Sequence, residues 1–195
     1  PMEELRRITD RIYQDYGVQF LQYGITEGYA PFLELISGWL KDAKNIATSP
    51  EEIQITTGSQ QGIDLVSKVF LNAGDEVVIE SPSYLSAFQV FNLYRATYLP
   101  VDSDDDGMKV AELAKLLKDG RRPKIVYTVP TYQNPTGITM SNDRRKALLD
   151  LAEEYNFYII EDNPYGELAY DGGQVPTLKS LDYSGRVIYL GSFSK

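Results

Sequence analysis

The sequence contains no cysteine and no histidine. Without cysteine there are no disulfides, no thiolate metal site and no cysteine nucleophile. Without histidine, Ser-His-Asp hydrolysis, histidine acid/base chemistry and most zinc sites are excluded as well. We therefore expect no metal site. If the chain is catalytic, lysine, tyrosine and carboxylate side chains must carry the reaction.

Long apolar runs and basic runs are also missing. No apolar run approaches the roughly 20 residues of a membrane span, and the N-terminus lacks the layout of a signal peptide. These features predict a cytoplasmic protein that does not enter a membrane. The formal net charge is -9, and without a basic patch nucleic acid is not expected as a partner.

The chain has 195 residues, of which 43% are hydrophobic, enough for one sizeable core. Pro1 stands immediately before a helical pattern, and Lys195 is followed by no turn or capping sequence. From these ends we expect a segment of a longer polypeptide.

Hydrophobic periodicity divides the chain into two parts. Residues 1–50 read as N-terminal helices, one over 3–16 and one beginning near Pro31, joined by a glycine-rich turn over 22–28. Residues 51–195 alternate between strand and helix patterns. Strands are expected at 53–57, 76–80, 96–100, 124–129, 157–161 and 187–190, and helices at 63–71, 84–93, 110–118 and 142–155. This alternation predicts an α/β fold with a mostly parallel sheet covered by helices on both faces.

Lys195 follows the predicted strand 187–190 directly, between hydroxyl residues. Ligand sites of open α/β sheets lie at such strand ends, where a partly desolvated lysine can attack carbonyl groups. Ser192 and Ser194 offer donors to an anion beside it. The alternative is an ordinary surface lysine in a polar turn.

Three further strand ends carry polar residues. Gly58, Ser59 and Gln60 form a glycine turn at the start of a helix. Such a turn can bind an anion through its free N–H groups. The alternative is that Ser59 simply caps the N-terminus of the helix. Asn134 lies in a loop after the strand 124–129, and its amide either binds a ligand or builds a turn. Asp162 ends a buried strand, and a buried carboxylate needs a cation or several hydrogen-bond donors. A cationic ligand would meet this need. The alternative is that Asp162 caps the local turn.

Asn134, Asp162 and Lys195 follow one another at intervals of about one β-α-β step, so all three should project from the same sheet edge. A lysine nucleophile, an anion pocket and an isolated buried carboxylate together suit one ligand. Pyridoxal phosphate has an aldehyde, a phosphate and a ring nitrogen that needs a carboxylate partner.

Six short motifs carry a family resemblance that spans residues 22–195. They are QYG at Gln22, TTGSQQGIDL at Thr56, ESPSY at Glu80, YTVPTYQNPTG at Tyr127, IIEDNPYGEL at Ile159 and GSFSK at Gly191. In this order and spacing the chain resembles the large domain of a pyridoxal-phosphate-dependent aminotransferase of fold type I, class I/II. Within that class it is similar to the aromatic amino acid and 2-aminoadipate branch.

The resemblance implies a role for each candidate site residue. Lys195 would hold the cofactor as a Schiff base and move the proton at the substrate Cα. Asp162 would pair with the pyridinium nitrogen. The remaining implied contacts are Tyr165 and Asn134 on the phenolic oxygen, Tyr84 on the ring face, and Gly58, Ser59, Gln60, Ser192 and, more weakly, Ser194 on the phosphate. Tyr23 would reach the phosphate of a neighbouring subunit, which implies a homodimer.

The implied function is transfer of an amino group between an amino acid and a 2-oxo acid. Two alternatives use the same fold, namely a pyridoxal-phosphate-sensing domain of a transcription regulator and a lyase or decarboxylase. The family's phosphate-binding and substrate-carboxylate arginines would lie beyond Lys195, so the segment should be an incomplete catalyst. The branch commonly has Leu-Arg where this chain has Phe32-Leu33. The resemblance also suggests a cis peptide bond between Asn134 and Pro135.

Overall fold

The computed structural model describes residues 1–169 and 175–195. The chain divides into two compact units, and each is described by itself. The first unit comprises Pro1–Trp39 with Thr48–Ile55, and the second comprises Leu40–Ala47 with Thr56–Lys195. No helix in the described ranges is long and apolar enough to cross a membrane.

The first unit is helical. It contains α1 (Met2–Tyr16), the 3-10 helices η1 (Gly17–Leu21) and η2 (Pro50–Glu52), and most of α2 (Ala30–Lys44). Gly28 has φ +136°, and a Cβ there would lie 2.6 Å from Cγ1 of Ile55. Only glycine fits a position that combines this backbone conformation with such close approach.

The predicted strand 53–57 is wrong. These residues form no ladder, and their backbone is tied to the turn before α2 by a bond from Ile55 N to Glu27 O (2.8 Å). Ile53 and Ile55 are half-buried while Gln54 is exposed. The alternation of apolar and polar residues therefore marks a half-buried extended segment, but a strand also requires a neighbouring strand.

The second unit is built on a six-stranded sheet with the order β3-β2-β1-β4-β5-β6. The strands are β1 (Glu76–Ser81), β2 (Thr97–Asp104), β3 (Gly107–Met108), β4 (Ile125–Thr128), β5 (Tyr158–Asn163) and β6 (Val187–Gly191). All neighbouring pairs are parallel except β2 and β3. The prediction of a mostly parallel sheet is confirmed.

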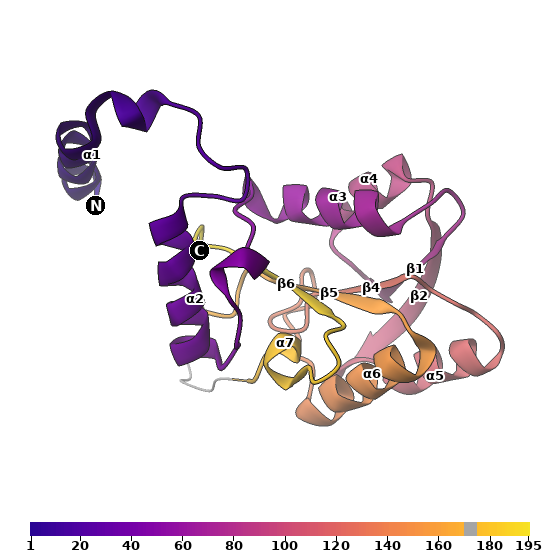
Figure 1. The fold of residues 1–195 in the computed structure, drawn as a ribbon. Coiled ribbons are helices and arrows are strands. Elements are labelled where there is room, and N and C mark those ends of the chain that lie inside the picture. The colour runs from indigo at the N-terminus through magenta and orange to yellow at the C-terminus, as the bar shows by residue number, and fades with distance from the viewer. Residues whose placement is uncertain (170–174) are drawn as a thin grey trace. The chain divides into compact units, whose positions relative to one another are not determined.

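Helices cover both faces of this sheet (Figure 1). One face carries α3 (Gly58–Phe70) and α4 (Leu85–Leu93), and the other carries α5 (Val110–Lys118), α6 (Asn142–Tyr155) and α7 (Leu178–Leu181). Side chains of β1 alternate between the two layers, since Val77 and Ile79 pack in one core cluster and Val78 in the other. The short elements β3 and α7 were not predicted, because so few residues leave no periodicity to detect.

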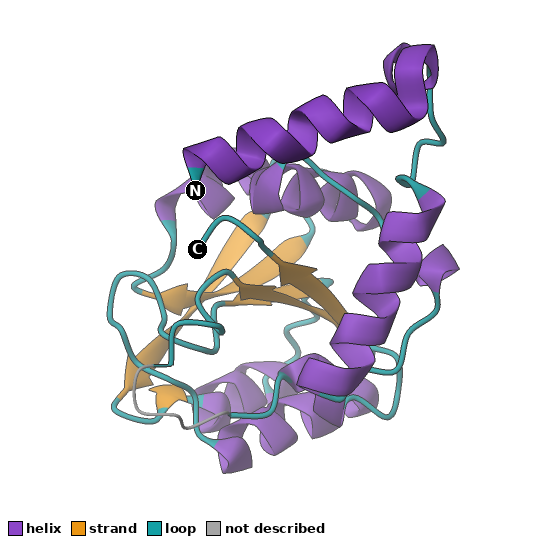
Figure 2. Ribbon diagram, turned by 90° about the vertical axis from the view of Figure 1, so that its left-hand side faces the viewer, coloured by secondary structure: helices purple, strands orange, loops and turns teal. Residues whose placement is uncertain are grey.

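The parallel arrangement determines where the polar strand ends lie. The carboxyl ends of β1, β4, β5 and β6 meet at one edge of the sheet, between the two helix layers (Figure 2). In the register of β5 and β6, Asp162 lies opposite Leu190 and Asn163 opposite Gly191. The residues after Gly191 therefore leave the sheet beside Asp162.

Candidate active site

Asp162 is buried at the carboxyl end of β5 and is only 2% exposed. Its Oδ2 accepts a hydrogen bond from the hydroxyl of Tyr127 (2.9 Å). Its Oδ1 is buried and has no hydrogen-bond partner among the described residues. Burial raises the pKa of Asp162, and the hydroxyls of Tyr127 and Ser59 offset only part of that rise. The carboxylate thus retains one oxygen that requires a donor.

Tyr127 was not among the predicted site residues. It lies on β4, is fully buried, and supplies the donor that holds Asp162. Burial and the neighbouring carboxylate of Asp162 raise the pKa of Tyr127, so its hydroxyl stays protonated. The available signal was a tyrosine within a buried strand, since a buried phenol usually has a hydrogen-bond partner.

The loop after β4 brings Asn134 to Tyr165, the two residues that the family resemblance assigns to the same oxygen of the cofactor. Asn134 Nδ2 donates to the hydroxyl of Tyr165 at 3.4 Å, and the Asn134–Pro135 peptide bond is cis. Tyr165 and Tyr84 both pack against the core cluster beneath α3 and α4. Tyr84 occupies the N-cap position of α4. Tyr84, Asn134 and Tyr165 therefore lie on the segments that follow β1, β4 and β5 in the second unit.

The start of α3 has the features of an anion site. The helix begins at Gly58 (φ +80°), and the N-cap Thr57 makes no side-chain capping bond. Ser59 lies inside the first turn, so the alternative of a Ser59 N-cap is wrong. The first-turn N–H groups lack intrahelical partners. Gln60 Nε2 donates to Ser86 O at 2.9 Å.

Gly62 is a second residue that sequence reasoning missed. A Cβ at Gly62 would lie 2.9 Å from Cδ2 of Leu190. The glycine therefore lets α3 approach β6 closely, which brings the first turn of α3 near the end of that strand. The sequence feature that could have identified Gly62 is its place inside a helical pattern, because a glycine there commonly marks close packing.

The segment after β6 holds its hydroxyls and its lysine together. The Oγ atoms of Ser192 and Ser194 lie 2.7 Å apart, and Lys195 Nζ donates to Ser194 Oγ at 3.3 Å. Lys195 is exposed in the described part of the chain, and the expected desolvation of its amine stays a prediction.

Tyr23 lies in the first unit, where its side chain is fully exposed within this chain. Its expected action across a subunit interface stays a prediction. No group of three or more acidic residues in the described ranges is placed to hold a metal ion.

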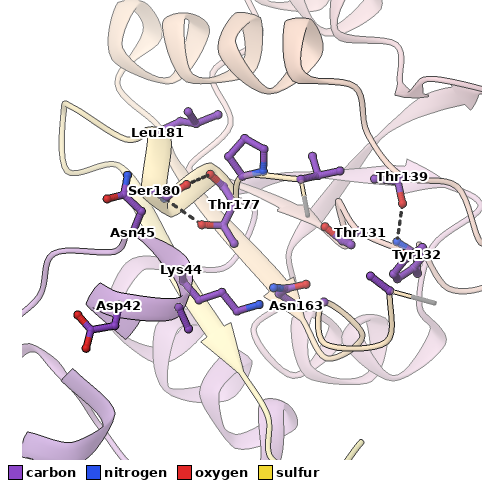
Figure 3. Close-up of a pocket in the computed structure, with 15 residues that line it drawn as sticks. Asp42, Lys44, Asn45, Thr131, Tyr132, Thr139, Asn163, Thr177, Ser180 and Leu181 are labelled. Carbon is purple, nitrogen blue, oxygen red and sulfur yellow. Dashed lines mark hydrogen bonds between the residues drawn. The ribbon is translucent and has the colours of Figure 1, made fainter. Parts of the chain in front are cut away.

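A cavity of about 460 Å³ lies within the second unit (Figure 3). It is lined by polar groups from the end of α2, the loop after β4 and α7, among them Lys44, Thr131, Asn163 and Thr177. Asn163 follows Asp162 directly and donates to the hydroxyl of Tyr189 at 3.0 Å. The cavity contains none of the predicted site residues.

Comparison with known proteins identifies the class. Residues 3–195 match the family "Aminotransferase class I and II", so the chain belongs to that family. It is 46% identical, over its whole length, to the aromatic-amino-acid aminotransferase 1 of Thermococcus litoralis and covers 48% of that protein.

Two solved structures have the same fold. The kynurenine aminotransferase of Pyrococcus horikoshii, in complex with PMP, superposes with a TM-score of 0.93 at 49% identity. LysN, the α-aminoadipate aminotransferase of Thermus thermophilus complexed with N-(5'-phosphopyridoxyl)-L-leucine, superposes with a TM-score of 0.92 at 40% identity. Both alignments cover all of this chain and 49% of the other. The chain thus spans about half the length of these relatives.

Proposed function

We propose that this chain is the cofactor-binding part of a pyridoxal-phosphate-dependent aminotransferase. The observation that carries the proposal is the buried carboxylate of Asp162. One of its oxygens is held by Tyr127, and the other has no donor among the described residues. A protonated pyridine nitrogen supplies the missing donor. The residues present therefore fit the group.

When bound, the cofactor supplies an aldehyde that condenses with amines and a ring that accepts electrons from the substrate Cα. Asp162 keeps the ring nitrogen protonated through a charge-assisted hydrogen bond, which is strong where water is excluded. Tyr127 orients that carboxylate. In that position Asp162 would stabilise the electron-accepting form of the ring more than its resting form, which is how such a carboxylate would favour the transition state.

The other residues orient and retain the cofactor. Asn134 and Tyr165, whose polar groups lie 3.4 Å apart, would donate to the phenolic oxygen, and Tyr84 would cover the ring. The first turn of α3, with Ser59 and Gln60, and the hydroxyls that follow β6 would hold the phosphate. The helix dipole and the free N–H groups there favour an anion.

Lys195 is the amine that holds the aldehyde and then moves the proton at the substrate Cα. Its place after β6 supports this role, because Ser192 and Ser194 lie beside it and Asp162 lies on the neighbouring strand. The carboxyl edge of a parallel sheet is where such ligand sites form.

The substrates are an amino acid and a 2-oxo acid. The aminotransferases named above support this reading over a regulator or a lyase, and they point to aromatic or 2-aminoadipate donors. The working unit is a homodimer in which Tyr23 reaches the neighbour's phosphate. Apolar side chains of α1, including Leu5 and Ile8, are exposed in this chain. They support the proposal that the second subunit covers this helix. A cytoplasmic location stays a prediction.

Full-length protein tests the proposal. Protein purified with pyridoxal phosphate should show a visible absorbance band that borohydride abolishes, and mass spectrometry should then find the phosphopyridoxyl group on Lys195. Lys195→Ala should lose the reducible band. A screen of amino donors with 2-oxoglutarate should give turnover with aromatic or 2-aminoadipate substrates. A retained, reducible band in Lys195→Ala would refute the assignment of the lysine.

A further inference from the structure

Arg145 on α6 is a fully buried arginine. Its guanidinium donates three hydrogen bonds, from Nε to Met140 O (3.0 Å) and from Nη2 to Pro130 O (2.6 Å) and Thr131 Oγ1 (3.0 Å). Two of these acceptors are backbone carbonyls at opposite ends of the loop over residues 130–140. A planar fork of donors can fix two backbone segments at once. Arg145 therefore closes the base of this loop.

The loop over residues 130–140 carries Asn134 towards Tyr165. Its backbone is also closed by bonds from Met140 N to Pro130 O and from Gln133 N to Ile138 O, both 2.8 Å. Pro130 O thus accepts from both Arg145 and Met140. The position of Asn134 depends on how this base is held, since the tip of the loop is partly exposed.

Arg145 also faces the strand that carries Asp162. Its Nη1 lies 3.7 Å from Oε1 of Glu161, the residue before Asp162. Glu161 is fully buried and accepts the N–H groups of Leu178 and Lys179, both at 2.8 Å. Glu80 is also buried, accepts from Val129 N at 3.0 Å, and interacts electrostatically with Arg145. The cation thus lies among buried carboxylates that need a partner.

We propose that Arg145 is a positioning residue, which sets the loop carrying Asn134 against the end of β5 carrying Asp162. The inference rests on the proposed roles of those two residues. Arg145 acts through Thr131, the loop carbonyls and Glu161, and it touches no reacting atom itself. A purely structural arginine would lower stability when replaced and leave the cofactor's properties unchanged.

The neighbouring Arg144 provides a matched control. It lies on the same turn of α6 and is also tied to backbone and carboxylate, with Nη1 to Met108 O (3.1 Å) and Nη2 to Asp104 Oδ2 (2.8 Å). Its partners belong to the β2–β3 hairpin rather than to the loop. Arg144→Lys and Arg145→Lys both keep the charge and both replace the planar fork by a single ammonium group.

The experiment uses full-length protein with pyridoxal phosphate. It measures the thermal midpoint, the affinity for the cofactor, the pH dependence of the visible absorbance band, and kcat with KM. Arg145→Lys should shift the pH dependence of the band, weaken cofactor binding and lower kcat. A misplacement of about 1 Å costs on the order of a hundredfold in rate. Arg144→Lys should lower the thermal midpoint and change the band, the cofactor affinity and kcat much less, because its partners reach the loop only through the packing of Gly107 against Met140.

Thr131→Val keeps the guanidinium of Arg145 and removes one of its acceptors. This variant therefore tests the positioning role if Arg145→Lys does not fold. It should move the band's pH dependence in the same direction by a smaller amount. Variants whose band, cofactor affinity and kcat match those of Arg144→Lys would overturn the positioning role. If the wild-type protein formed no borohydride-reducible band, the proposed function itself would fail, and this inference with it.

Discussion

At the scale of single residues, the candidate site depends on how a buried carboxylate is satisfied. Tyr127 supplies one donor to Asp162, and the second oxygen is left for a ligand. Both contacts would involve the carboxylate, but only the contact to a protonated ring nitrogen would join two opposite charges, whereas the hydroxyl of Tyr127 is a neutral donor. Two substitutions separate them.

Asp162→Asn should retain some cofactor and lose most transamination, because an amide cannot hold the ring nitrogen protonated. A fall in kcat on the order of a thousandfold or more is expected in the full-length enzyme. Tyr127→Phe keeps the carboxylate and removes one donor, so its fall should be about tenfold to a hundredfold. Near-normal turnover of Asp162→Asn would mean that the carboxylate only supports the local fold.

Glu161 predicts a dependence of stability on pH. Burial raises the pKa of Glu161 to about 7, above its ordinary 4.5, although the N–H groups of Lys179 and Leu178 and the charge of Arg145 oppose the rise. The folded protein therefore binds more protons than the unfolded chain between these values, so the free energy of unfolding falls as pH rises from about 4.5 to about 7. Burial raises the pKa of Glu80 to about 7 as well.

The measurement is the urea midpoint of full-length protein between pH 5 and pH 7.5. Glu161→Gln cannot ionise, so its midpoint should fall less steeply with pH than that of the wild type. Glu112→Gln, on the exposed side of α5, serves as the control and should keep the wild-type slope. Identical slopes for all three proteins would contradict a protonated Glu161.

At the scale of elements, the β2–β3 hairpin is joined to the loop over residues 130–140. Gly107 has φ +92°, and a Cβ there would lie 2.9 Å from Cα of Met140. Met140 also supplies a carbonyl to Arg145. The hairpin, the end of the loop and α6 therefore pack as one assembly, in which a short unpredicted strand has a structural role.

Gly107→Ala should destabilise the full-length protein by two separate effects. The positive φ costs about 1–2 kcal/mol for an alanine, and displacing the Met140 backbone adds about 1–3 kcal/mol. Gly120→Ala isolates the first effect, because Gly120 has φ +96° and a Cβ there would meet no atom within 4 Å. Chemical denaturation should rank Gly107→Ala clearly below Gly120→Ala. Equal losses would show that the approach to Met140 relaxes at no cost.

At the scale of the whole molecule, we propose that a second subunit completes the site. Tyr23 lies in a unit of its own and is fully exposed within this chain. The proposal places its hydroxyl on the neighbour's phosphate. Mixed dimers of full-length chains test this arrangement directly.

Tyr23→Ala subunits and Lys195→Ala subunits should each be nearly inactive alone. If Tyr23 acts in trans, a mixed dimer contains one site with native Lys195 and the partner's native Tyr23, so activity returns on mixing. Mixtures of each variant with itself, after the same unfolding and refolding or exchange step, are the control. If mixing restores nothing although mixed dimers form, Tyr23 acts within its own subunit.

Sequence patterns were sufficient for the elements that are long and periodic. The α/β alternation, the mostly parallel sheet and the strand-end positions of Asn134, Asp162 and Lys195 follow from apolar periodicity, because burying a strand or a helix face imposes a repeat on neighbouring residues. The family resemblance assigned Asn134 and Tyr165 to one oxygen of the cofactor, and the structure places their polar groups 3.4 Å apart. The segment 53–57 shows the limit, since periodicity does not reveal whether a partner strand exists.

The tertiary structure alone decided which distant side chains meet. Tyr127 on β4 reaches Asp162 on the neighbouring strand β5. Arg145 binds both ends of the loop over residues 130–140 and also faces Glu161 on β5. Gly62 brings α3 against Leu190. Side chains become buried only when separate segments exclude water together. This burial raises the pKa of Asp162, Glu80 and Glu161. The local sequence determines periodicity and turn chemistry, whereas contacts between segments far apart in the chain depend on packing of the whole sheet and its helices.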